Sequence, residues 1–305
     1  MRRRSYGRDL GLSVRMLLSG ALLGLLYVGF AVVLLSVLNV GLAPMLLIVV
    51  GLALFQYYTS DKLALAAAGA KVVSVEEAPE LHAIVERLCA MADLPKPKLA
   101  VMETDVPNAF ATGRNPKHAA VCVTTGLWRR LDAQEAEGVL AHELSHIANR
   151  DVLVMTLASF FAMLAALLTR FAMYAGLFGG FGGSRRDNNQ VPVWLIVLAV
   201  SIVTYAISFV LIRMISRYRE YAADRGSALI TGAPEYLMSA LQKISGQMAL
   251  IPQRDLREVQ GMNALFIVPA SVKTATAELL LDHPPLEKRL DALERISRQM
   301  GRPAQ

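Results

Sequence analysis

The sequence predicts a mainly α-helical, polytopic membrane protein with about four transmembrane helices and, outside the membrane, an α+β part with a small sheet. Hydrophobic residues make up 54% of the 305 residues, and the mean hydropathy is +0.43, which is too apolar for an ordinary soluble domain. The apolar residues are concentrated in runs long enough to cross a hydrocarbon core of about 30 Å. The polar stretches between these runs contain helical and strand-like patterns, which predict the α+β part.

The predicted transmembrane helices are four apolar runs of about 20 or more residues each. They are Met16–Leu38, Val40–Tyr58, Val152–Phe178 and Val193–Ile212. The first two follow each other almost directly, with Asn39 and Gly41 between them, and therefore predict a tight helical hairpin.

The positive charge of the chain is best explained by membrane topology. The formal net charge is +6 and the pI about 9.4, but most of the arginines lie beside apolar runs, and no nucleic-acid-binding motif accompanies them. Five arginines precede the first run, which predicts a cytoplasmic N-terminus. Arg185 and Arg186, in the Gly-rich loop Gly179–Gln190, oppose this orientation but are fewer. Both long polar stretches are then expected on the cytoplasmic side.

These observations divide the chain into five expected segments. They are a cytosolic basic N-terminus (1–15), a transmembrane hairpin (16–58), a cytosolic catalytic part (59–151), a second pair of transmembrane helices with an extracytoplasmic loop (152–213) and a cytosolic helical part (214–305). The two cysteines, Cys89 and Cys122, predict neither a disulfide framework nor a metal-binding pair.

Local patterns predict the elements of the polar stretches. Helices are expected at 78–93, 133–150, 214–230, 234–247, 272–281 and 285–299, and strands at 98–102 and 119–124. Residues 106–116 are rich in turn-forming types and are expected to be irregular. The helix 133–150 is expected to continue into the third apolar run after Asp151, and the strand 119–124 to form the edge of a cleft. His82 and His118 have no motif partner and are expected at the surface.

A metal-binding motif lies on the helix 133–150. His142-Glu143-Leu144-Ser145-His146 is an H-E-x-x-H sequence, and residues i and i+4 of a helix share one face, so both imidazoles can reach one zinc ion. Glu143 lies beside that ion and can act as the base that takes a proton from water. Catalytic zinc sites usually have three protein ligands, so a third must come from elsewhere in the chain.

The stretch Arg219–Gly226 offers the third ligand. Glu220 and Asp224 are spaced i, i+4 and share a helix face. Alone, they would be read equally well as a solvated acidic pair. Together with the H-E-x-x-H helix, Glu220 is expected to bind zinc, and Asp224 to accept the free N–H of a ligating histidine and fix its tautomer.

The chain resembles the HtpX-type membrane zinc metalloproteases, gluzincin-like peptidases related to the CAAX prenyl endoproteases. The matching stretches are Asn108–Gly113 (NAFATG), Leu140–Asn149 (LAHELSHIAN), Arg219–Ala228 (REYAADRGSA) and His283–Leu290 (HPPLEKRL). The resemblance implies a zincin-like domain with one Zn²⁺ per chain, in the bacterial inner membrane, with its active site facing the cytoplasm. It also implies endopeptidase activity on misfolded or damaged membrane proteins, and specifies no oligomeric state.

The resemblance also implies roles for individual residues. His142, His146 and Glu220 correspond to the zinc ligands, Glu143 to the base and Asp224 to the residue behind the ligands. His283 and Arg289 correspond to a pair beside the active site, where His283 is the expected donor to the oxyanion and Arg289 orients it or shares that role. Asn108 binds substrate backbone or organises its own turn. Asp282 departs from the hydroxyl residue that relatives often have before this motif.

Two other functions share parts of this pattern. An intramembrane zinc protease also uses H-E-x-x-H, but within an apolar span and typically with an aspartate as third ligand; here the motif helix is charged and the partner is a glutamate. A non-enzymatic membrane scaffold with structural zinc would need four ligands, often cysteines, and only three are evident.

Overall fold

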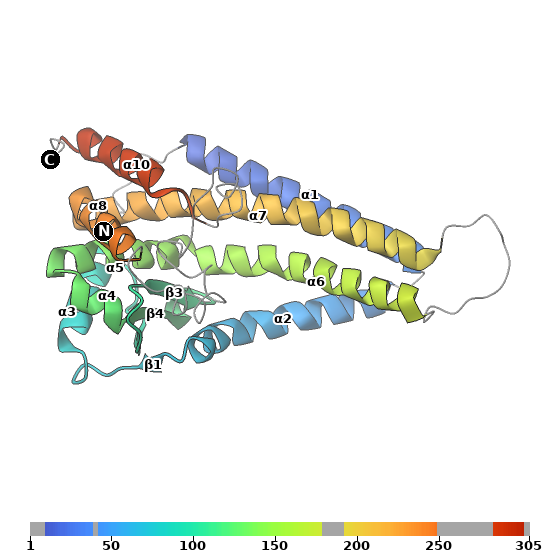
Figure 1. Cartoon of the computed structure of the whole chain (residues 1–305), viewed down its shortest axis with the longest axis horizontal. Coiled ribbons are helices and arrows are strands. Elements are labelled where there is room, and N and C mark those ends of the chain that lie inside the picture. The colour runs from blue at the N-terminus through green and yellow to red at the C-terminus, as the bar shows by residue number, and fades with distance from the viewer. Residues whose placement is uncertain (1–9, 39–41, 179–191, 249–282, 302–305) are drawn as a thin grey trace.

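The computed structural model describes residues 10–38, 42–178, 192–248 and 283–301. Long helices run side by side along most of its length, and a small sheet with shorter helices lies at one end of them (Figure 1). Several sequence-based expectations lie outside the described residues: the helix 272–281, the loop Gly179–Gln190, the hairpin turn at Asn39 and Gly41, and Asp282.

The long helices correspond to the predicted apolar runs. They are α1 (Leu10–Leu38), α2 (Leu42–Ala67), α6 (Asp151–Phe178) and α7 (Val193–Thr231). Three of them, α1, α6 and α7, are long and apolar enough to cross a membrane, while the described part of α2 contains a shorter apolar stretch, Val49–Thr59. The mainly helical membrane fold is therefore confirmed, with three clear spans among the described residues where about four were expected for the chain.

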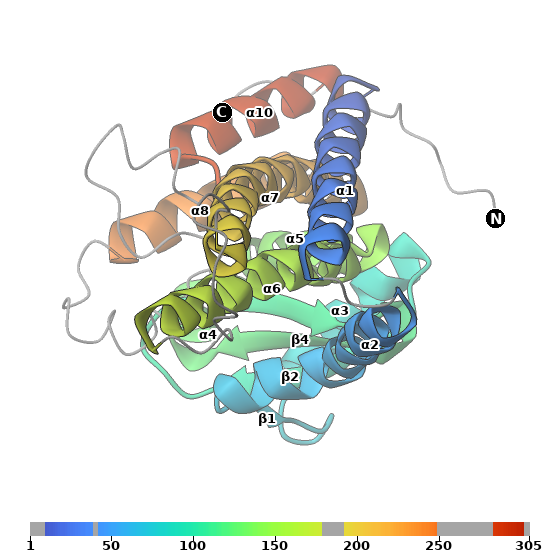
Figure 2. The same ribbon diagram turned by 90° about the vertical axis from the view of Figure 1, so that its right-hand side faces the viewer.

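Each long helix packs against at least one other long helix. Helix α7 contacts both α1 and α6, and α2 contacts α6 (Figure 2). Polar side chains link α6 to α1 and α2: the Tyr27 hydroxyl of α1 donates to the Ala158 carbonyl at 2.8 Å, and the Gln56 amide of α2 donates to the Thr156 carbonyl at 3.3 Å. Both bonds satisfy groups that would be costly to leave unpaired in an apolar environment.

The sheet has four strands in the order β1-β2-β4-β3. The strands are β1 (Lys71–Val72), β2 (Lys98–Met102), β3 (Ala109–Gly113) and β4 (Ala119–Thr124). Strand β4 runs parallel to β2 and antiparallel to β3. The predicted edge position of β4 is therefore wrong, because β3 occupies that edge. Residues 109–113, expected to be irregular, form this strand because pairing with β4 outweighs the turn signals around them.

The shorter helices include α5, which carries the H-E-x-x-H motif. They are α3 (Pro79–Ala92), the 3-10 turn η1 (Pro116–His118), α4 (Thr125–Arg130), α5 (Ala133–Asn149), α8 (Pro234–Met248) and α10 (Leu286–Gln299). Helix α5 contacts α7, α8, α3 and β3. One apolar core contains residues from Leu81 to Ile147 and from Ala228 to Leu293, so the segments before and after the membrane pair α6–α7 fold together.

Close approach of backbones fixes α5 against its neighbours. A side-chain carbon at Gly138 would lie 2.6 Å from the backbone nitrogen of Leu237 on α8. On the other side, the Ser227 hydroxyl of α7 donates to the Gly138 carbonyl at 2.7 Å. Gly138 is therefore needed for the close contact between the motif helix and α8. His82, expected at the surface, is buried, with its Nε2 3.1 Å from the Val73 carbonyl, because α3 packs over β1 and the chain after it.

The N-terminus of α5 is closed by a capping box. The Asp132 carboxylate accepts the N–H groups of Gln134 and Glu135, and the Glu135 carboxylate accepts the Asp132 N–H. Glu135 also accepts bonds from Ser239 and Lys243 of α8 at 2.7 and 2.6 Å.

Replacing Asp132 with alanine should destabilise the fold modestly, by about 1 kcal/mol, because two N–H groups of α5 lose their acceptor. Chemical denaturation of the detergent-solubilised protein measures the effect. Asp132→Asn is the matched control, since asparagine also accepts these bonds. Equal loss in both variants would argue against capping as the cause.

Candidate metal centre

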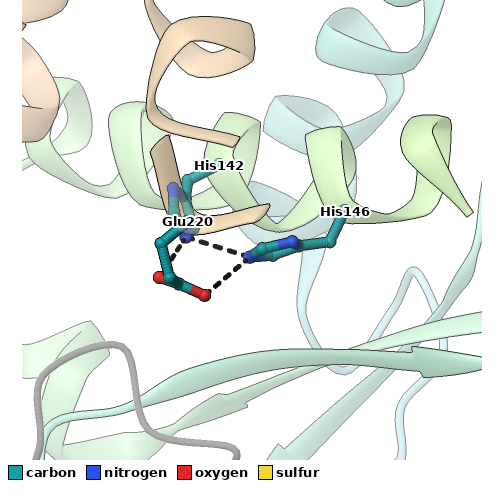
Figure 3. A group of neighbouring side chains, drawn as sticks. All are labelled: His142, His146 and Glu220. Carbon is teal, nitrogen blue, oxygen red and sulfur yellow. Dashed lines mark hydrogen bonds and ion pairs between the residues drawn. The ribbon is translucent and has the colours of Figure 1, made fainter. Parts of the chain in front are cut away.

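Three buried side chains converge from two helices. His142 and His146 extend from one face of α5, and Glu220 extends from α7 toward both (Figure 3). The Nε2 atoms of the histidines are 3.2 Å apart, and the Glu220 carboxylate oxygens lie 3.6 Å from His142 Nε2 and 3.5 Å from His146 Nε2. Within the described residues, this is the group of side chains arranged to hold a metal ion.

The spacing of these atoms fits zinc. A tetrahedral ion with bonds of about 2.0–2.1 Å separates its ligand atoms by about 3.3–3.4 Å. The observed separations of 3.2, 3.5 and 3.6 Å lie close to that value. Three ligands also leave the fourth position of such an ion open, as catalytic zinc sites require.

The protonation of the two histidine rings is also consistent with a shared metal ion. His146 Nδ1 lies 2.7 Å from Asp151 Oδ2, and His142 Nδ1 lies 3.0 Å from Asp224 Oδ1. A carboxylate can only accept, so His146 Nδ1 carries the proton of its hydrogen bond, and the nearby Asp224 oxygen favours the proton on Nδ1 of His142 as well. Each neutral ring then has a bare lone pair on Nε2, and these lone pairs face each other and Glu220. A cation between them removes the repulsion.

The charge of the surroundings also favours a cation. Four buried carboxylates (Glu143, Asp151, Glu220 and Asp224) outnumber two buried guanidiniums (Arg219 and Arg289). Burial by itself lowers the pKa of His142, but the carboxylates of Asp224 and Glu220 raise it to about 9. The site thus stabilises positive charge strongly.

Glu143 lies between α5 and the sheet. Its side chain is buried, and its carboxylate accepts a hydrogen bond from the backbone N–H of Ala111 on β3. Burial raises the pKa of the Glu143 carboxyl above its ordinary value, although the neighbouring histidines lower it in part. A carboxylate held in this way, next to the metal ligands, is suited to exchange a proton with substrate or water.

Helix α10 and the residues before it bring His283 and Arg289 to the same place. His283 Nδ1 lies 3.0 Å from Glu220 Oε2. Arg289 donates from Nε and Nη2 to both oxygens of Asp224, at 2.9 and 2.6 Å, and its Nη1 lies 3.6 Å from Glu220 Oε2. All these side chains are buried, so Arg289 compensates the charge of Asp224 and contacts the third ligand.

Asn108 lies just before β3 and is buried. Its backbone N–H donates to the Thr124 hydroxyl at 2.9 Å, and its carbonyl accepts both the hydroxyl and the backbone N–H of Thr124. These bonds join the beginning of β3 to the end of β4. The backbone of Asn108 therefore organises this turn.

Two further residues of the site were missed by the sequence analysis, Asp151 and Arg219. Asp151 contacts His146, and Arg219 contacts Asp151 at 3.2 Å. In the sequence, Arg219 begins the stretch that contains Glu220, and Asp151 follows the H-E-x-x-H helix. A continuous helix through Asp151, as was expected, would have pointed its side chain away from His146.

Comparison with known proteins agrees with this geometry. A family model described as Peptidase family M48 matches residues 75–297, which include every residue of the centre. The chain belongs to peptidase family M48. In this family the histidine pair and Glu220 are the zinc-binding triad of a metallopeptidase, and the resemblance inferred from the sequence is confirmed.

Relatives match this M48 chain over nearly its whole length. It is 52% identical over 300 residues to "Protease HtpX homolog 1" of Streptomyces coelicolor, covering 97% of this chain and 96% of the relative. It is 51% identical over 298 residues to "Protease HtpX homolog" of Moorella thermoacetica, covering 98% of both. It is 50% identical over 301 residues to "Protease HtpX homolog 2" of Methanosarcina acetivorans, covering 98% of this chain and 100% of the relative.

A solved structure shares the M48 fold. The crystal structure of S. mikatae Ste24p superimposes with a TM-score of 0.55 at 20% sequence identity, covering 94% of this chain and 65% of that protein. At this identity the likeness concerns the fold alone. The protein is thus a multi-pass membrane zinc metallopeptidase of the HtpX type.

Proposed function

We propose that this M48 peptidase cleaves misfolded or damaged membrane proteins at the cytosolic face of the bilayer. The observation that carries the proposal is the continuity of α7, which contains a membrane span and ends in the metal centre. Glu220 lies about 40 Å along α7 from Val193, at 1.5 Å per residue, beyond a hydrocarbon core of about 30 Å. The zinc ligands are then held just outside the lipid, within reach of segments that leave the membrane.

The same placement argues against intramembrane cleavage. The motif helix α5 is enclosed by α3, α8 and the sheet, and its N-terminal turn carries Asp132 and Glu135 in a capping box. A purely structural zinc site is disfavoured because Glu143, a buried carboxylate beside the ligands, would have no role in it.

In the proposed mechanism, Glu143 moves the proton. Zinc, when bound, supplies a Lewis acid that polarises the scissile carbonyl and makes water more acidic. The Glu143 carboxylate accepts the proton of the attacking water and then gives it to the leaving amine.

His283 is proposed to stabilise the oxyanion. Neither of its ring nitrogens has a hydrogen-bond partner within the described part of the chain, although Nδ1 lies near Glu220. With Nδ1–H directed at the Glu220 carboxylate, Nε2 donates to the substrate oxygen from the imidazolium form of the ring. Arg289 is proposed to act through Asp224 and Glu220, since its guanidinium bonds the first and lies near the second.

Strand β3 is proposed to bind the substrate backbone. Thr124 N–H bonds Asn108 C=O, so by antiparallel alternation the backbone groups of Phe110 and Thr112 face β4, and those of Ala109, Ala111 and Gly113 face the outer edge, where the Ala111 N–H already bonds the Glu143 carboxylate. An extended peptide can pair with this edge through main-chain bonds, with little dependence on side chains. Asn108, next to this edge, is a proposed substrate contact. Such tolerance suits a protease that acts on many damaged proteins.

The substrate class is tested by quantitative proteomics of membranes from cells that express the wild-type chain or Glu143→Gln. Membrane proteins should accumulate in the variant, most of all under conditions that damage them, and purified accumulated proteins should be cleaved by the wild-type enzyme in liposomes. Accumulation restricted to soluble proteins would contradict the proposal.

The orientation is tested by labelling an introduced cysteine. Lys117 is exposed on η1, and both native cysteines are buried, so Lys117→Cys gives one reactive thiol. An impermeant maleimide should label it in inside-out vesicles and not in intact cells. Labelling in intact cells would place the metal centre on the outer side.

A further inference from the structure

The two zinc-binding histidines each contact a buried aspartate that is paired with a buried arginine. Behind His142 the pair is Asp224 and Arg289, and behind His146 it is Asp151 and Arg219. The first pair lies within two motifs of the family resemblance. In the second pair, Asp151 lies outside the matching stretches and Arg219 is the first residue of one of them, and neither has a role in the mechanism given above.

The contact between His146 and Asp151 is the better formed of the two. Its Nδ1–Oδ2 distance of 2.7 Å meets the geometry of a hydrogen bond. The distance from His142 Nδ1 to Asp224 Oδ1 is 3.0 Å, but this nitrogen does not reach hydrogen-bond geometry. Asp151 is almost fully buried, at 1% exposure, so its charge must be compensated. Arg219, on α7 next to Glu220, supplies that compensation at 3.2 Å.

A break in the helix makes this contact possible. Helix α5 ends at Asn149, and Arg150 adopts a left-handed conformation with φ 58° before α6 begins at Asp151. In an unbroken helix, a residue five positions after His146 would point about 140° away from it, at 100° per residue. The turn at Arg150 instead brings Asp151 back onto the imidazole.

We propose that Asp151 and Arg219 are positioning residues for the zinc ligand His146. Asp151 holds the proton on Nδ1 and orients the ring, so that Nε2 presents its lone pair to the metal, and Arg219 holds Asp151. Asp151 is the first residue of the membrane helix α6, and Arg219 is on α7, so the pair links both membrane helices to the centre. The inference rests on the zinc chemistry of the proposed function, but it is tested by metal binding.

The test measures zinc affinity of the full detergent-solubilised chain by competition with a chelator. Asp151→Asn should bind zinc on the order of 10–100-fold more weakly, as is usual when the partner of a ligating histidine is lost. The absorption spectrum of the cobalt-substituted protein should shift. Arg219→Gln should weaken zinc binding as well, Arg219→Lys should restore most of it, and Asp151→Asn with Arg219→Gln should be no weaker than Asp151→Asn alone.

Two controls separate positioning from general loss of structure. Glu135→Gln removes a buried acid of α5 that pairs with Lys243 of α8, away from the metal, and should leave zinc affinity unchanged. Arg150→Gly and Arg150→Val both remove the exposed arginine at the helix break. Glycine tolerates the left-handed conformation and should retain affinity, whereas valine resists it and should lower affinity.

Unchanged zinc affinity and an unchanged cobalt spectrum in Asp151→Asn would overturn the positioning role, even if the variant were less stable to heat. The proposed function fails separately: a chain that binds zinc as predicted here but cleaves no membrane protein would overturn that function alone. A wild-type chain without zinc affinity would overturn both.

Discussion

Replacing Glu143 with glutamine should nearly abolish peptide hydrolysis while zinc remains bound. Glutamine has almost the same size and can still accept the Ala111 N–H bond, but it cannot take up a proton at neutral pH. General acid–base catalysis contributes on the order of 100–10,000-fold, so kcat should fall by about that factor. The measurement is cleavage of a fluorogenic peptide or an unfolded membrane protein by the purified enzyme, with zinc content determined in parallel.

The matched control for this variant is Glu137→Gln, on the same helix. Glu137 pairs with the exposed Arg87 at 2.7 Å, away from the zinc ligands, so its loss should change activity little. Substantial residual activity in Glu143→Gln, together with full zinc content, would show that another group moves the proton. Loss of zinc would instead show that Glu143 supports the metal.

Replacing Arg289 with methionine should give the largest loss of stability. The guanidinium is 2% exposed and binds both oxygens of Asp224, so its removal leaves a buried carboxylate without its cation. Breaking a buried pair in this way typically costs about 3–5 kcal/mol. Chemical denaturation of the metal-free protein in detergent measures the effect, and zinc affinity should also fall because Asp224 no longer holds His142.

Arg298→Met on the same helix is the matched control. Arg298 pairs with Glu294 at the surface, with its side chain 64% exposed, so its loss should change the free energy of unfolding by less than about 0.5 kcal/mol. The loss of stability in Arg289→Lys should lie between those of the two methionine variants, because lysine keeps the charge but cannot bind both carboxylate oxygens of Asp224 as the guanidinium does. Equal stability of the two methionine variants would contradict the assigned pairing.

The sequence was most informative where the structural signal is local. Hydrophobic runs predicted the membrane helices because burial in lipid requires long apolar segments. Helix periodicity predicted that His142 and His146 share one face, and that Glu220 and Asp224 share another. Local patterns also predicted the bounds of several elements closely. The helix expected at 133–150 is α5 (Ala133–Asn149), and the strands expected at 98–102 and 119–124 are β2 and β4.

The sequence failed where the outcome depends on distant pairing. Strand β3 was missed because its residues become a strand only by bonding to β4, and this also moved β4 from the edge to the interior of the sheet. The burial of His82 was missed because it requires α3 to pack over the chain after β1. None of these contacts produces a hydrophobic periodicity that the local sequence would show.

The sequence by itself determined the chemistry of this protein: the zinc ligands, the acid beside them and the apolar helices that anchor them. These features depend on residue type and on helical spacing, and both can be read from residues that are close together in the sequence. Only the tertiary structure decided how the ligands are supported. The left-handed conformation of Arg150 brings Asp151 into contact with His146, and the packing of α10 brings Arg289 into contact with Asp224. Such contacts arise from a single backbone angle or from packing of distant segments, and they are stable only once the whole core has formed.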